Sequence, residues 1–154
     1  MASRSDGAAP TGSLRVLHAT RMKTKQPIIN AFVRLLLSAG LMRRSTALLE
    51  TTGRKSGQPR ITPVTNGLRD DEFWIVTEHG SRAGYVRNIE ANPRVRVKVG
   101  HRWRSGTAHF IDEASPEATL KRIVDENPAT RRNAEVIRRI QTKMRVIRID
   151  LDRP

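Results

Sequence analysis

The sequence predicts an α+β domain in which a mostly antiparallel sheet of six strands curls into a small barrel with flanking helices. The length of 154 residues suits one domain. Short segments with apolar side chains at every second position recur along the chain, and helical patterns are inserted among them without regular alternation. The chain has no cysteine, which excludes a disulfide framework and favours a reducing, cytoplasmic location.

The N-terminal part divides into an arm and a helix. Residues 1–26 mix Ser, Gly, Ala and Thr with Arg and Lys and have no sustained apolar period, which predicts a mobile basic arm. Over 27–43, Ile28 and Phe32 begin an amphipathic pattern that is too short to span a membrane. We expect 27–154 to form the cofactor-binding domain, with this helix covering one end of the barrel. Peripheral contact of its basic flanks with anionic lipid is the alternative.

The strands are predicted from alternating apolar and polar residues between turn residues. Two of the turns that join them are expected at Asp70 with Asp71 and at Gly100 with His101. The six expected strands are Ala47–Thr51, Arg60–Val64, Glu72–Thr77, Arg94–Val99, Trp103–Ile111 and Arg145–Leu151.

Three helices are expected after the first strands. Gly84–Ala91 is predicted as a short helix that an Asn-Pro pair ends. Ser115, followed by Pro116, is a strong start signal, and a second Asn-Pro pair ends that helix at Asn127. The third helix is basic and covers about Thr130–Thr142.

The charge of the chain predicts an anionic partner. Lys and Arg number 29 against 15 Asp and Glu, a formal net charge of +14. Nucleic acid, an acidic membrane surface and a phosphorylated small molecule all fit that charge. The basic residues are spread over every element and aromatic residues are few, so we expect no specific nucleic-acid partner. The four histidines have no ligand spacing, so we expect no metal site.

The segment over 51–60 predicts a phosphate-binding turn. Its two glycines allow a tight bend with outward amide groups, and the cations Arg54, Lys55 and Arg60 surround that bend together with the hydroxyl of Ser56. It is not a P-loop, because the lysine precedes the second glycine. An ordinary exposed hairpin turn is the alternative interpretation.

A second basic segment over 79–88 leads into the short helix. A glycine-rich approach to a helix N-terminus suits an anion, and His79, Arg82 and Arg87 add positive charge. Tyr85 is the only tyrosine and could present a flat face and a hydroxyl to a ring system. A solvated loop and simple packing of the tyrosine are the alternatives.

Two strings together carry a family resemblance. Thr-Thr-Gly-Arg-Lys-Ser-Gly-Gln-Pro-Arg at 51–60 and Asn-Ile-Glu-Ala-Asn-Pro at 88–93 resemble the deazaflavin-dependent nitroreductase family of split β-barrel oxidoreductases. The resemblance runs from about 47 to 111. It implies that the chain binds coenzyme F420, a deazaflavin whose tail carries a phosphodiester and several glutamates. FMN is the alternative cofactor, because related split barrels use it.

The resemblance also implies roles for individual residues. It assigns the anionic tail to Arg54, Lys55, Ser56 and Arg60, and the ring to Ile61, Thr62, Pro63, Val64 and Thr65. It completes the pocket with Val76, Thr77, Glu78, His79, Gly84, Tyr85, Val86, Arg87 and Asn88. Tyr85 and His79 are the candidates for passing a proton to the product.

The implied reaction is hydride transfer from reduced coenzyme F420 to an electron-poor double bond of an enone, a quinone or a related compound. The expected partner is therefore a small-molecule electron acceptor. The alternative is a non-catalytic deazaflavin- or FMN-binding module, either free or associated with a membrane. The sequence leaves the oligomeric state open, a homodimer included.

Overall fold

The computed structural model describes residues 44–77, 79–140 and 143–153. The basic arm predicted over 1–26 and the helix predicted over 27–43 lie outside these residues. So do Glu78, which is one of the predicted site residues, and the end of the helix predicted to reach Thr142.

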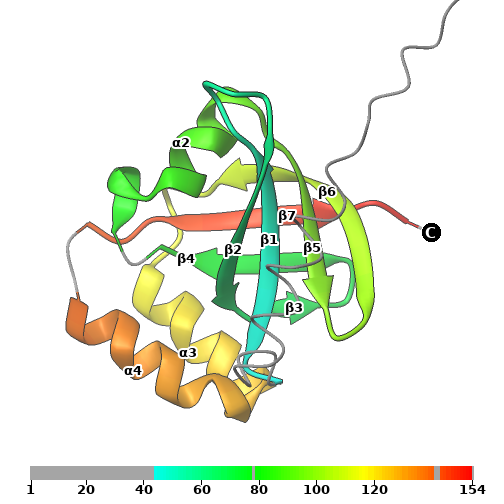
Figure 1. Ribbon diagram of the computed structural model, residues 1–154. Coiled ribbons are helices and arrows are strands. Elements are labelled where there is room, and N and C mark those ends of the chain that lie inside the picture. The colour runs from blue at the N-terminus through cyan, green and yellow to red at the C-terminus, as the bar shows by residue number, and fades with distance from the viewer. Residues whose placement is uncertain (1–43, 78, 141–142, 154) are drawn as a thin grey trace, which may run out of the picture.

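The described strands form one curled antiparallel sheet (Figure 1). Their order is β2-β1-β5-β6-β7-β4-β3, and every pair of neighbours is antiparallel. The strands are β1 Thr46–Thr52, β2 Pro59–Thr65, β3 Leu68–Arg69, β4 Glu72–Val76, β5 Arg94–Val99, β6 Arg102–Phe110 and β7 Val146–Leu151. The α+β class and the curled antiparallel sheet are therefore confirmed.

The prediction of six strands was wrong, because the described sheet has seven. The additional strand, β3, pairs with β4 through only two residues, Leu68 and Arg69. Both residues are exposed, so the strand has no buried position that could mark it in the sequence. The predicted turn at Asp70 and Asp71 is present between β3 and β4, and Asp70 takes a positive φ of 49° there.

Three α-helices and two short 3-10 turns complete the described chain. They are η1 Gly80–Arg82, α2 Gly84–Ala91, α3 Pro116–Glu126, η2 Pro128–Thr130 and α4 Arg131–Ile140. The predicted helix start is confirmed, because the Ser115 hydroxyl accepts a hydrogen bond from the Ala118 amide at 3.3 Å.

Two apolar clusters lie on opposite faces of the sheet. Successive residues of a strand point to opposite faces. Ile75 belongs to one cluster, which we call the inner cluster, and Val76 belongs to the other, which we call the outer cluster. The inner cluster is closed by Val86 and Ile89 of α2, and the outer one by residues of α3 and α4. Figure 1 shows α2 at the same end of the sheet as the β1–β2 turn, with α3 and α4 at another corner.

Candidate functional site

The turn between β1 and β2 is a tight bend over Gly53–Gln58. The Gly53 amide donates to the Gln58 carbonyl at 2.8 Å, and the Gly57 amide donates to the Gly53 carbonyl at 2.7 Å. Gly57 has a φ of +63°, a conformation that favours glycine. A Cβ atom on Gly53 would lie 3.0 Å from the backbone carbonyl oxygen of Gln58 and 2.8 Å from the Ser56 hydroxyl oxygen. The bend therefore depends on both glycines of the motif.

The cations of this bend are not neutralised within the described protein. Arg54, Lys55 and Arg60 are all exposed. No carboxylate of the described residues lies within 4.0 Å of any of them. Three uncompensated charges on one short segment maintain a local positive potential that attracts an anion.

A cavity of about 400 Å³ lies between the bend and α2, and we call it the cationic cavity. Its lining contains all three of these cations and no carboxylate of the described chain. The lining residues are Gly53, Arg54, Lys55, Ser56, Arg60, Ile61, Thr62, Gly84, Tyr85 and Asn88.

A second cavity, of about 300 Å³, adjoins the first, and we call it the apolar cavity. The two share Thr62, Gly84 and Tyr85, so they lie side by side, and we call the pair the groove, with a charged end and an apolar end. The apolar cavity is lined by Thr62, Pro63, Val64, Thr65, Ile75, Val76, His79, Ala83, Gly84, Tyr85 and Ile137. This arrangement suits a ligand with a flat ring and an anionic tail.

The N-terminus of α2 faces both cavities through Gly84. Its N-cap residue, Ala83, makes no side-chain capping bond, and the first turn contains no acidic residue. A Cβ atom on Gly84 would meet nothing within 4 Å, so open space lies beside its backbone. The amide groups of the first turn and the positive end of the helix dipole thus add to the attraction for an anion.

Asn88 links α2 to the bend and to β1. Its Oδ1 atom accepts hydrogen bonds from the Arg54 amide at 3.2 Å and from Arg54 Nη1 at 3.4 Å. Its Nδ2 atom donates to the Thr51 hydroxyl at 3.0 Å. Asn88 is only 6% exposed, and leaving such a buried amide without partners would cost about 1–3 kcal/mol.

Three of the predicted site residues that the structure describes do not line these cavities. The Thr77 side chain is fully buried, and its hydroxyl accepts from the Arg145 amide at 2.9 Å. Val86 is buried in the inner apolar cluster, and Arg87 is exposed on α2 outside both linings. Glu78 lies outside the described residues. The other predicted residues are brought together around the groove.

The structure adds lining residues that sequence reasoning missed. Gly53, Ile75 and Ala83 lie next to predicted residues in the chain, so a wider window around each motif would have included them. Ile137 comes from α4, and no local signal connects that helix with the groove. Its inclusion depends on how α4 packs against the sheet.

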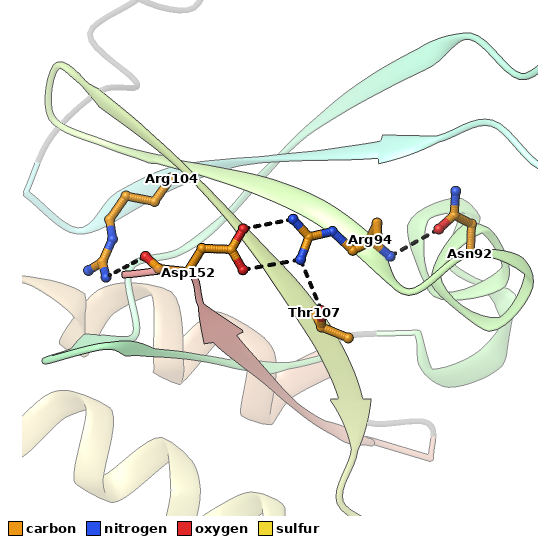
Figure 2. A network of polar contacts seen from close by, with 5 residues as sticks. All are labelled: Asn92, Arg94, Arg104, Thr107 and Asp152. Carbon is orange, nitrogen blue, oxygen red and sulfur yellow. Dashed lines mark hydrogen bonds and ion pairs between the residues drawn. The ribbon is translucent and has the colours of Figure 1, made fainter. Parts of the chain in front are cut away.

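Arginines at another part of the sheet are paired with carboxylates, and Figure 2 shows the pair of Arg94 with Asp152. Arg94 donates from both terminal nitrogens to Asp152, at 3.1 and 2.7 Å. This hydrogen bonding lowers the pKa of Asp152 below its usual value and raises the pKa of Arg94. Arg104 donates to Asp71 at 2.7 Å and to the Asp152 carbonyl at 3.3 Å.

A larger cavity of about 730 Å³ lies beside these pairs. Its lining contains the carboxylates of Asp71 and Asp152 together with Arg102, Arg104 and Arg153. The two carboxylates offset much of the positive charge, so this cavity fits a polyanion less well than the cationic cavity does.

Comparison with known proteins identifies the family. The model of the F420H(2)-dependent quinone reductase family matches residues 16–146, which is most of the chain. The chain belongs to this family. The resemblance to deazaflavin-dependent oxidoreductases seen in the sequence is thereby confirmed.

Curated relatives include F420H(2)-dependent quinone reductases of Mycobacterium tuberculosis. The similarity is 39% identity over 88 residues, which cover 54% of this chain and 59% of the relative. The match therefore spans less than two thirds of the length of these relatives.

Solved structures support the fold. An F420-H2 dependent reductase, FDR-A, matches with a TM-score of 0.54 and 23% identity, over 69% of this chain and 94% of that chain. HutZ, a heme storage protein from Vibrio cholerae, matches with a TM-score of 0.55 and 14% identity, over 84% of this chain and 91% of that chain. In the described part of this chain, no helix has the length and apolar character needed to cross a membrane.

Proposed function

We propose that the chain is a reductase that moves a hydride from reduced coenzyme F420 to an electron-poor double bond, such as that of a quinone or an enone. One observation carries the proposal beside family membership. A cavity with three uncompensated cations adjoins an apolar cavity at Gly84 and Tyr85. The cofactor is coenzyme F420. Its anionic tail suits the charged end of the groove, and its ring suits the apolar end.

The cationic cavity holds the anionic tail. Arg54, Lys55 and Arg60 supply charged donors, and Ser56 adds a hydroxyl. Charge-assisted hydrogen bonds contribute about 1.5–3 kcal/mol each. Four such bonds would contribute about 6–12 kcal/mol before ordering costs are subtracted, a range that includes the roughly 8 kcal/mol that corresponds to micromolar affinity.

The apolar cavity holds the ring and excludes water. The aliphatic residues Val64, Ile75 and Val76 line this cavity, and the backbone of β2 runs along one side. The bound coenzyme supplies the hydride, and these side chains orient the ring and the acceptor relative to each other. The reduced acceptor also takes up a proton, and both Tyr85 and His79 line this cavity.

Separate variants distinguish the two proton donors. Tyr85→Phe removes only the phenolic oxygen, and His79→Gln removes the titratable ring. A donor contributes about 10²–10⁴-fold to the rate, so we expect one of these variants to lose at least tenfold in kcat in stopped-flow measurements. Unchanged kcat in both would assign proton delivery to solvent.

Anaerobic titration tests the cofactor and the reaction. We expect coenzyme F420 to bind more tightly than FMN, and the reduced form to be oxidised only after a quinone or an enone is added. Binding without acceptor-dependent oxidation would favour the alternative, a non-catalytic module. Tighter binding of FMN would overturn the cofactor assignment.

The role of the N-terminal residues belongs to the proposal as well. We propose that 27–154 act as one cofactor-binding domain in the cytoplasm, and that 27–43 either cover the barrel or contact anionic lipid. Flotation with anionic vesicles, for the full chain and for a chain without residues 1–44, separates the two. Equal flotation of both proteins would exclude lipid contact through 27–43.

A further inference from the structure

We propose that Asn88 is a positioning residue that holds Arg54 and the bend in a binding-ready arrangement before any cofactor arrives. The proposal rests on the proposed function, because it concerns the same cationic cavity. It assigns to Asn88 an indirect role, through Arg54 and Thr51, in addition to its place in the lining.

The hydrogen-bond pattern fixes the orientation of the Asn88 amide. Two donors of Arg54, the main-chain N–H and Nη1, converge on one end of it at 3.2 and 3.4 Å. That end must be the carbonyl oxygen, because the amide nitrogen would place donors against donors. The other end is then the nitrogen, which donates to the Thr51 hydroxyl at 3.0 Å.

Burial makes this arrangement specific. Asn88 lies on the buried side of α2 beside Val86 and Ile89, where an apolar side chain would be the ordinary choice for packing. Thr51 is only 2% exposed. Polar groups at such depth require partners. The described partners of Asn88 are Arg54, which is 34 residues away, and Thr51, which is 37 residues away.

The hydrogen bonds of Asn88 to Arg54 and Thr51, which we call the clamp, pre-organise Arg54 for ligand binding. Arg54 is exposed, and a long exposed side chain loses conformational freedom when it binds a ligand. The clamp restricts the main chain and the guanidinium of Arg54 in advance, which lowers that loss. Thr51 lines neither the cationic nor the apolar cavity, and the bond described for its hydroxyl is the one from Asn88.

Amide exchange of the cofactor-free full chain tests the clamp directly. The Arg54 amide donates to Asn88, so its exchange measured by NMR reports on this bond. We expect exchange about tenfold faster in Asn88→Ala and a smaller increase in Thr51→Val. Thr119→Val is the matched control, because Thr119 is also buried and its hydroxyl donates to the Ser115 carbonyl at 2.9 Å on α3. Unchanged Arg54 exchange in Asn88→Ala would overturn the proposal.

Cofactor binding and kinetics provide a second, independent test of the proposal. We expect Thr51→Val to raise the Kd and KM for reduced coenzyme F420 about threefold without changing kcat, and Thr51→Ser to restore both to within about twofold. Equal affinity of wild type and Thr51→Val would overturn the proposal while the proposed function stands. Failure of the wild type to bind coenzyme F420 would overturn the proposed function, and the exchange measurement would still decide the clamp.

Discussion

Two sets of basic residues on this sheet differ in what surrounds them. At the β1–β2 bend, Arg54, Lys55 and Arg60 have no carboxylate of the described chain within 4.0 Å. Elsewhere on the sheet, Arg94 is paired with Asp152 (Figure 2), and Arg104 is paired with Asp71. The first set leaves its charge for a ligand, whereas the second uses its charge to join β5 to the C-terminal residues and β6 to the β3–β4 turn.

The difference shows why net charge is a poor guide to a binding site. An arginine with an internal carboxylate partner adds to the count of basic residues but contributes little field at a distance. The functional signal is a group of cations whose counter-ions are missing and which border a cavity. In the described chain, the β1–β2 bend meets both conditions.

Removing the uncompensated charges tests the comparison with the largest expected effect. Arg54→Ala combined with Lys55→Ala should weaken binding of coenzyme F420 at least tenfold, or about 1.4 kcal/mol, because two charged donors to the tail are lost. Isothermal titration measures the change. Arg104→Ala, which removes a paired arginine, is the control and should leave the affinity within about twofold. Equal losses in both proteins would contradict the distinction between the two sets.

The shape of the bend is the next target. Gly57→Ala places a side chain at a φ of +63°, which destabilises a protein by about 1 kcal/mol. We expect a similar loss in the free energy of cofactor binding, about fivefold in Kd, because the displaced bend carries the cations. Thermal denaturation and titration of the same protein measure the two effects. Unaltered affinity with reduced stability would mean that the bend does not position the ligand.

Added salt should weaken the attraction between the cations of the bend and the cofactor tail more than it weakens the arginine–aspartate pairs. The Debye length falls from about 10 Å at 0.1 M to about 3 Å at 1 M ionic strength, so exposed cations lose much of their attraction for the tail. We expect the Kd for coenzyme F420 to rise about threefold between these concentrations in the wild type. The double variant of Arg54 and Lys55 should show a weaker dependence. A salt dependence that is equal in the two proteins would indicate that other cations attract the tail.

The paired set gives the smallest effect, and that effect depends on pH. The pKa of Asp152 is lowered in the folded protein, chiefly by the hydrogen bond from Arg94. The pair therefore contributes stability above the usual carboxyl pKa of about 4, and the contribution is lost as the pH falls through the lowered value. Asp152→Asn should be slightly less stable than the wild type at neutral pH, and the difference should shrink in acid, as measured by thermal denaturation. The cofactor affinity should not change.

Local patterns predicted most of the secondary structure. Arg94–Val99 and Gly84–Ala91 have the bounds that alternation and the Asn-Pro pair indicate, because strand period and helix stop signals depend on adjacent residues. β3 was missed because two exposed residues show no period. The bend was predicted as an anion site because its glycines and cations are contiguous in the chain.

The parts of the site that depend on distant residues could not be predicted. Ile137 enters the apolar cavity from α4, and Asn88 reaches Arg54 across 34 residues. Val86 and Thr77 lie within predicted motifs, yet their side chains are buried away from the groove. A string of residues identifies a segment, whereas the direction of each side chain is set by how the segment packs.

The sequence by itself determined the net charge of +14, the helices and strands that have local signals, and the family motif that contains the bend. The tertiary structure decided which of the cations remain available to a ligand. Arg94 meets Asp152 across 58 residues, whereas Arg54 meets an uncharged amide. Electrostatic interaction depends on distance in space and on the polarity of the medium, and neither quantity can be obtained from positions along the chain.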